Sequence, residues 1–154
     1  MTAATGQSVR VVGPGEGDVV TFRNGVVMAR KVTSEETGGR WALGVGDNPN
    51  PGFVNTPHTH TEPEAFYVLE GTYTFFTEGD DREVGPGTLV FIPPETRHGF
   101  VVGPGGGKLL CVWPAAFDGY FREMNEALSS GTATPGVMDE IAGRHGMSNL
   151  PPSP

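Results

Sequence analysis

The stretch TPHTHTEPEAFYVLEG, residues 56–71, holds two of the four histidines in the chain and ends on a glycine. In an extended strand alternate side chains point the same way, so His58 and His60 project from one face. Glu64 has the same parity, and Pro63 favours an edge or a bend that turns the Glu64 carboxylate toward the same point. Two imidazoles and a carboxylate make a mixed nitrogen and oxygen site. Such a site suits a divalent transition metal.

A fourth ligand is expected from a distant part of the chain. His98 stands in RHGF, after the turn-rich segment PPET and at the start of another predicted strand. In an arbitrary β protein such histidines are surface or hydrogen-bonded strand residues, and Glu64 could equally form a salt bridge. The metal interpretation therefore depends on how well the spacing fits a known site.

Residues 52–71, GFVNTPHTHTEPEAFYVLEG, resemble the first sequence motif of the cupin superfamily. This motif is a glycine, His-x-His, a glutamate and a closing glycine at fixed spacing. All five positions are in register: Gly52, His58, His60, Glu64 and Gly71. The match implies that this segment belongs to a cupin metal site.

The second cupin motif is met in part, after the fifteen intervening residues 72–86. Gly87, Pro93 and His98 occupy their expected positions. Glu95 replaces the motif glycine and Val102 its asparagine. Val102 removes no expected ligand, whereas Glu95 is expected either to alter the turn or to face the rim of the pocket.

The resemblance implies a jelly-roll β-barrel that holds one divalent transition metal per chain, which would be Ni, Mn, Fe, Co or Zn. The implied ligands are His58, His60, Glu64 and His98. The short spacing between the motifs and the segment WPAAFDGYFREM at 113–124 look like small single-domain bacterial cupins similar to quercetin dioxygenase. Homodimerisation is also implied, with residues 1–20 as a strand or arm on the neighbouring barrel.

The first functional hypothesis from this resemblance is a metal-dependent dioxygenase acting on a small aromatic or polyphenolic, flavonol-like substrate. Glu64 would then be both a metal ligand and the catalytic proton acceptor. Two alternatives stay open. One is a metal-dependent cyclase or isomerase of aromatic polyketides that uses no oxygen, and the other is a non-catalytic small-molecule-binding cupin.

The strand pattern independently predicts an all-β fold. Eight short segments are rich in Val, Phe, Tyr, Leu and Thr: 18–22, 26–32, 41–45, 64–70, 72–77, 88–92, 98–102 and 108–113. Strands at this spacing indicate a sandwich or a closed barrel, and Asn24-Gly25 predicts a hairpin. We expect one cupin domain over 1–154, with the barrel at about 18–113 and a helical segment at about 115–146.

The helical segment begins after Pro114. Five apolar residues recur there at three- and four-residue steps: Phe117, Tyr120, Phe121, Met124 and Leu128. This period predicts an amphipathic helix that packs against the outside of the barrel. A second short helix is predicted over 136–145, with Gly146 at its C-terminal cap.

Charge and composition exclude several kinds of partner. The net charge is -8, and Lys and Arg form no cluster that could follow a phosphate backbone, so we expect no nucleic-acid partner. The N-terminal stretch lacks the apolar core of a signal peptide and no apolar run could span a bilayer, so we expect a cytoplasmic protein without membrane contact. The lone Cys111 lies in an apolar run and is interpreted as a buried packing residue.

Other residues near the motifs have simpler interpretations. His145 would interact with helix carbonyls rather than a metal, and Glu62 would be a solvated loop carboxylate with proton transfer as the alternative. Four strand residues could either wall a ligand pocket or fill the core, with neither favoured: Phe66, Val68, Phe75 and Phe100.

Overall fold

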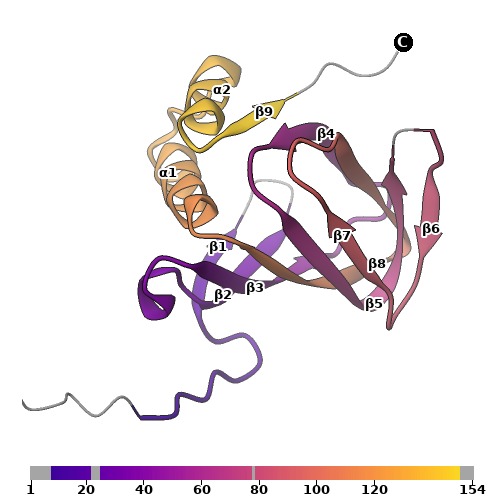
Figure 1. The fold of residues 1–154 in the computed structure, drawn as a ribbon, viewed down its shortest axis with the longest axis horizontal. Coiled ribbons are helices and arrows are strands. Elements are labelled where there is room, and N and C mark those ends of the chain that lie inside the picture. The colour runs from indigo at the N-terminus through magenta and orange to yellow at the C-terminus, as the bar shows by residue number, and fades with distance from the viewer. Residues whose placement is uncertain (1–7, 22–24, 78, 150–154) are drawn as a thin grey trace, which may run out of the picture.

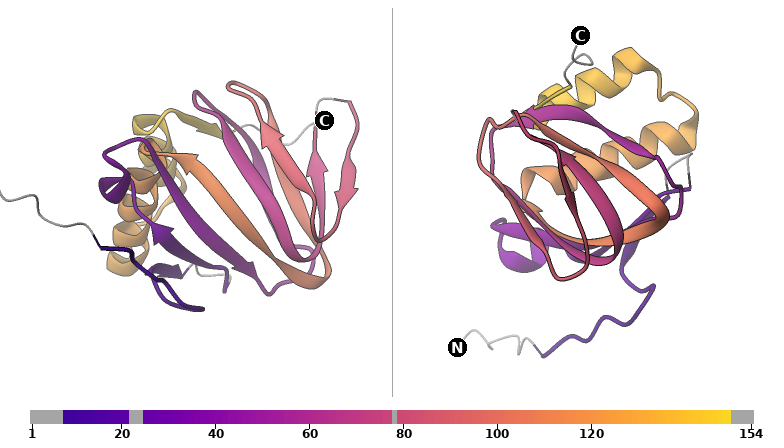
Figure 2. Two further views of the ribbon diagram at one scale, coloured as in Figure 1. Left: turned by 60° about the horizontal axis from the view of Figure 1, so that its bottom comes forward. Right: turned by 90° about the vertical axis from the view of Figure 1, so that its right-hand side faces the viewer.

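A computed structural model describes residues 8–21, 25–77 and 79–149 of the chain. Among them, nine strands form a barrel and two helices lie together at one end of it (Figures 1 and 2). The strands are β1 (Asp18–Thr21), β2 (Val27–Val32), β3 (Trp41–Asn48), β4 (Val54–His60), β5 (Glu64–Phe76), β6 (Arg82–Val84), β7 (Leu89–Ile92), β8 (His98–Pro114) and β9 (Met147–Asn149). The helices are α1 (Ala116–Ser130) and α2 (Pro135–Arg144), with a short 3-10 turn at Glu35–Thr37. The predicted all-β barrel with C-terminal helices is confirmed.

All strand pairs are antiparallel, and β8 connects the two sides of the barrel. Its first part pairs with β4, with Val101 opposite Val54. Its second part pairs with β3, with Val112 opposite Leu43. Along both parts β8 also pairs with β5. The two long strands thus run along both sides of the barrel and hold them together.

Two pairs of predicted strands are continuous in the structure. The segments 64–70 and 72–77 join as β5, and 98–102 and 108–113 join as β8. The glycines that suggested a break instead allow a bend while pairing continues, with Gly71 at a φ of 75° opposite Gly107. Sequence reasoning also left β4, β6 and β9 out of its strand list, because β4 is polar and the other two are short.

The core lies inside the barrel and extends under the helices. Its largest fully buried side chains include Trp113, Tyr73, Phe75 and Phe117. The hairpin expected at Asn24-Gly25 falls partly outside the described residues, but β1 and β2 do pair as a hairpin requires. Among the described residues, no helix has the length and apolar character that a membrane crossing requires.

An ion pair fixes the start of α1, and a capping side chain fixes the start of α2. Arg30 of β2 is buried and pairs with Asp118 in the first turn of α1, at 3.4 Å. Thr134 caps α2 by accepting a hydrogen bond from the Val137 amide, and Pro135 follows at the first helical position. Helix α1 is therefore held against the sheet at its start, next to the end of β8.

Candidate metal centre

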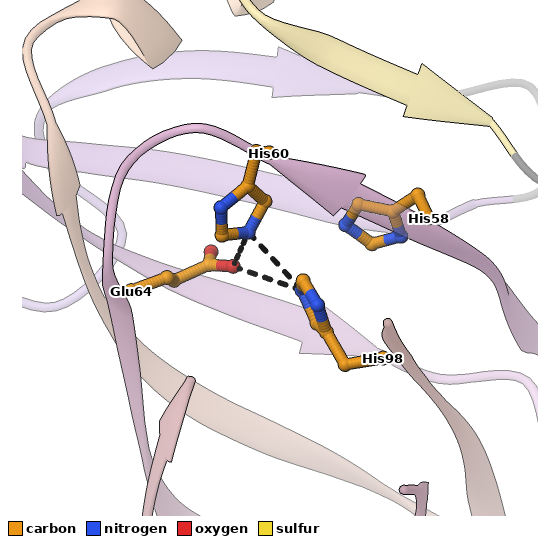
Figure 3. Close-up of side chains that lie close together, drawn as sticks. All are labelled: His58, His60, Glu64 and His98. Carbon is orange, nitrogen blue, oxygen red and sulfur yellow. Dashed lines mark hydrogen bonds and ion pairs between the residues drawn. The ribbon is translucent and has the colours of Figure 1, made fainter. Parts of the chain in front are cut away.

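Strands β4, β5 and β8 bring the four predicted ligands together (Figure 3). His58 and His98 stand opposite each other in the β4–β8 pairing, and His60 lies two residues further along β4. Glu64 opens β5 directly after the bend that follows β4. One candidate ligand atom from each side chain lies within 4.8 Å of the others. The structure therefore places all four side chains around one point.

The distances within this cluster are short. His60 Nε2 lies 3.1 Å from Glu64 Oε2 and 3.2 Å from His98 Nε2. His98 Nε2 lies 3.5 Å from the same carboxylate oxygen. The ring of His58 completes the group, 4.3 Å from the His98 ring between centroids.

Backbone carbonyls fix the orientation of each imidazole. The Nδ1 atoms of His58 and His98 each bond to the carbonyl two residues earlier, at Thr56 and Thr96, both at 2.8 Å. His60 Nδ1 bonds to the carbonyl of Glu62 at 2.5 Å. A carbonyl can only accept, so Nδ1 carries the proton in all three rings. A ring whose Nε2 carries no proton then presents the lone pair of that atom for coordination.

This donor set fits a divalent transition metal. The Nε2 lone pairs of His60 and His98 face each other at 3.2 Å, an arrangement that is repulsive unless a cation or a proton lies between them. Imidazole nitrogens with one carboxylate oxygen suit zinc, copper, iron, nickel and similar ions. The carbonyl contacts hold the rings in place independently of the ion.

The electrostatics of the cluster favour a positive ion. Burial would raise the pKa of Glu64, but the hydrogen bonds of His60 and His98 hold it below its usual value. Burial and then the charge of His98 lower the pKa of His58 to about 4, so this ring is neutral near pH 7. Burial would lower the pKa of His60, but its hydrogen bond to Glu64 raises it. A metal ion would take the place of the proton between His60 and Glu64, because a coordinating imidazole must be neutral.

A cavity of about 350 Å³ opens beside the cluster. His58 and Glu64 line it, whereas His60 and His98 are only 2% and 1% exposed and lie behind them. Phe66 and Phe100 also line the cavity, while Val68 and Phe75 belong to the core without lining it. Of the four residues that could wall a pocket or fill the core, two therefore line the cavity and two only fill the core.

Helix α1 lies over this cavity, which corrects the expectation that it packs on the outside of the barrel. Its apolar face lines the cavity through Phe117, Tyr120, Phe121 and Met124. Phe117 meets the His60 ring edge-on at 5.0 Å, and Phe121 packs on Trp113 at 5.1 Å. The periodicity identified the apolar face correctly but carried no information about which surface would cover it.

The side chains of the remaining predicted residues are not part of the cluster. His145 pairs with Glu123 at 2.8 Å, so its partner is a carboxylate of α1 rather than a metal or helix carbonyls. Glu62 is exposed, as a solvated loop carboxylate is. Cys111 is buried, as predicted, and burial raises the pKa of its thiol well above the usual value.

Glu95 adopts a backbone conformation that favours glycine. Its φ is 59°, the one positive value at a non-glycine position among the described residues. Its amide donates to the carbonyl of His60 at 2.8 Å, which ties the turn before His98 to the end of β4. Its side chain is exposed and is not among those that line the cavity. Of the two outcomes expected for Glu95, a side chain at the rim of the pocket is not found.

Comparison with known proteins finds similarity over parts of the chain. Residues 48–113 match the family model described as Cupin domain. Dimethylsulfoniopropionate lyase DddW of Ruegeria pomeroyi is 39% identical over 56 residues, which are 36% of this chain and 37% of that protein. Quercetin 2,3-dioxygenase of Bacillus subtilis is 26% identical over 118 residues, 75% of this chain and 34% of that protein. The chain thus spans just over a third of the length of these curated relatives.

A solved structure adds a third similarity. The polyketide cyclase RemF of Streptomyces resistomycificus superposes with a TM-score of 0.61 at 28% identity. The similarity covers 70% of this chain and 80% of that one. A dioxygenase, a lyase and a cyclase are thus all similar to this chain, so the comparison alone does not select one activity.

Proposed function

The chain belongs to the cupin superfamily, and on that premise we propose that it is a metal-dependent dioxygenase acting on a small aromatic or polyphenolic, flavonol-like molecule. The observation that carries this proposal is the convergence of three imidazoles and one carboxylate beside a largely apolar cavity. Similarity to quercetin 2,3-dioxygenase over three quarters of the chain supports the reaction class.

The proposed ligands of one divalent transition metal are His58, His60, Glu64 and His98. Four protein ligands leave one or two coordination positions for other molecules. When bound, the ion supplies a Lewis acid that favours the anionic form of a substrate hydroxyl, from which electrons pass to dioxygen. Nickel, manganese, iron or cobalt would favour this reaction.

Glu64 is the proposed proton acceptor. It lines the cavity, and the low pKa that His60 and His98 impose keeps it a carboxylate near pH 7. A carboxylate at the wall of the cavity is placed to take the hydroxyl proton of a bound phenol or enol. The aromatic walls of the cavity would exclude bulk water during this step.

Oxygen uptake with a panel of flavonols, quercetin included, tests the proposal. We expect the metal-loaded protein to consume dioxygen in step with loss of the flavonol, and Glu64→Gln to abolish both. No oxygen consumption with any flavonol, at full metal occupancy, would contradict the proposal.

A second candidate is a metal-dependent cyclase or isomerase of aromatic polyketides. The similarity to RemF favours it, because that similarity covers 80% of the RemF chain, against 37% and 34% of the two curated relatives. In this case Glu64 or a histidine would shuttle a proton while no oxygen is consumed. Zinc at full occupancy with product formation under nitrogen would support the cyclase. If neither reaction is detected, a non-catalytic binding protein is the interpretation that remains.

We also propose a homodimer and a cytoplasmic location. Outward-facing apolar side chains lie next to one another on β5 and β7, where Tyr67, Leu89 and Phe91 are 39%, 63% and 58% exposed. Such a patch on a chain of this size suits contact with another subunit. Light scattering should give twice the chain mass for the wild type and a lower mass for Leu89→Glu. The proposed arm at 1–20 lies partly outside the described residues.

A further inference from the structure

Strand β9 pairs with the strand that carries two of the proposed metal ligands. His58 stands opposite Asn149, and His60 stands opposite Met147. Figure 1 shows β9 beside β4, with α2 leading into it. Residues 58–60 therefore have β9 along one edge, while β8 pairs with the other edge of β4. The C-terminal strand thus forms one border of the metal centre.

Strand β9 also borders the mouth of the cavity. Met147 and Asn149 both line the cavity. Val54 and Thr56 line it from β4 and are exposed, so the cavity reaches the surface along this part of β4. The pairing with β9 covers residues 58–60, directly after that opening. Release of β9 would extend the opening along β4 toward the metal ligands.

The C-terminal segment 115–149 is held more firmly at its start than at its end. At the start, the buried Arg30 pairs with Asp118 of α1 at 3.4 Å, and the Asp118 carboxylate also accepts a hydrogen bond from the amide of Ser34. At the end, β9 has three residues, two of them exposed. A short exposed edge strand opens locally at lower cost than the core strands do. The end of the segment can therefore release while its start stays attached.

We propose that β9 is a gate, which narrows the mouth of the cavity while it pairs with β4 and admits bulkier molecules when it releases. Burial of Met147 in the core favours the closed state. Asn149 donates a hydrogen bond to Asp139 of α2 at 2.9 Å, so β9 would move together with α2. The gate is independent of the reaction and would serve a dioxygenase, a cyclase or a binding protein alike.

A proline in β9 weakens the gate. Thr59 and Ser148 are partners in the β4–β9 pairing, and the Thr61 amide donates to the carbonyl of Gly146 two residues further along. Hydrogen-bonded pairs alternate in an antiparallel ladder, so the Ser148 amide donates to β4 as well. Ser148→Pro removes this donor, and Ser148→Ala keeps it as the matched control. Neither Thr59 nor Ser148 lines the cavity.

Alkylation of Cys111 in the metal-loaded protein measures entry into the cavity. Cys111 is the one cysteine of the chain, lines the cavity and is 2% exposed. N-methylmaleimide and N-phenylmaleimide carry the same reactive group and differ in bulk, and mass spectrometry gives their rates relative to those with glutathione. We expect Ser148→Pro to raise the N-phenylmaleimide rate about fivefold, the factor that one lost hydrogen bond carries. The N-methylmaleimide rate should rise less, and Ser148→Ala should match the wild type.

A disulfide between the two strands locks the gate. A hydrogen-bonded antiparallel pair has the Cα separation that a disulfide requires, so Thr59→Cys combined with Ser148→Cys joins β4 to β9. In the oxidised variant Cys111 is again the one free thiol, which allows direct comparison with the wild type. The N-phenylmaleimide rate should fall about tenfold, and the N-methylmaleimide rate should fall less.

The proposal is overturned if the disulfide leaves the N-phenylmaleimide rate unchanged, or if a folded Ser148→Pro protein reacts like Ser148→Ala. Equal changes with both reagents would also overturn it, because they would show that Cys111 becomes accessible through global unfolding. If Ser148→Pro does not fold, the disulfide variant still decides. A gate that behaves as expected in a protein without oxygen uptake would refute the dioxygenase proposal alone.

Discussion

The histidines of the cluster owe their orientation to backbone carbonyls. At His58 and His98 the same contact recurs, from Nδ1 to the carbonyl two residues earlier, on two strands that face each other. This contact fixes the tautomer before any ion binds, so little side-chain freedom remains to be lost on coordination. The carbonyls of Thr56 and Thr96 could not be assigned from residue types, because any residue supplies a carbonyl.

Glu95 adopts a left-handed backbone conformation that is unfavourable for a residue with a Cβ atom. Glu95→Gly should therefore raise the free energy of unfolding by about 0.5–1 kcal/mol, after the greater unfolded-state entropy of glycine is deducted. Urea unfolding of the metal-free protein measures this change.

Glu62→Gly is the matched control, because Glu62 is an exposed loop glutamate outside the set of residues with positive φ. That substitution should lower stability slightly, through the unfolded state alone. Equal effects of the two substitutions would show that Glu95 carries no strain.

The long strands β5 and β8 depend on a close approach at their bends. A Cβ atom at Gly71 would lie 2.0 Å from the carbonyl oxygen of Gly106. Gly52 has the same φ of 75° but nothing within 4 Å of its Cβ position. The glycines at the two ends of the first motif are thus required for different reasons. Gly52 is required for its backbone conformation, and Gly71 also because there is no space for a side chain.

Alanine at each position separates these reasons. Gly52→Ala should cost about 1 kcal/mol of unfolding free energy, the penalty for a left-handed alanine. Gly71→Ala should cost about 2–4 kcal/mol, since the clash with β8 is added. Chemical denaturation provides both values, and similar losses would mean that β5 and β8 can separate at this point without cost.

Helices α1 and α2 are linked by charges that respond to acid. Glu123 of α1 accepts hydrogen bonds from Arg144 and pairs with His145, and these partners lower the pKa of the Glu123 carboxyl. A carboxyl whose pKa is lower in the folded state stabilises the protein above its unfolded pKa, near 4.5. This stabilisation is lost as the pH falls through the folded pKa.

Glu123→Gln should therefore be less stable than the wild type at pH 7, and the difference should disappear in acid, below the folded pKa of Glu123. Urea unfolding at both pH values tests this. Glu126→Gln, at an exposed position of the same helix, should be close to neutral at pH 7. A deficit of Glu123→Gln that persists in acid would show that the charge of Glu123 is not what links the helices.

Much of the molecule as a whole could be predicted from its sequence. The spacing of residues 52–71, together with the place of His98 in the second motif, predicted which four side chains would converge, because strand parity and motif register constrain them strongly. The amphipathic period predicted α1 but not its place over the cavity, which depends on the bend between Pro114 and Ala116. Strand continuity at Gly71 was missed, since glycine is compatible with both a turn and a bent strand.

Elemental analysis of protein purified without added metal tests the central claim most directly. We predict about one transition-metal ion per chain in the wild type and in His145→Ala, whose histidine lies outside the cluster and pairs with Glu123. His98→Ala should retain a small fraction of that ion. A wild type with far less than one ion per chain, or a His98→Ala protein that keeps its full complement, would contradict the account.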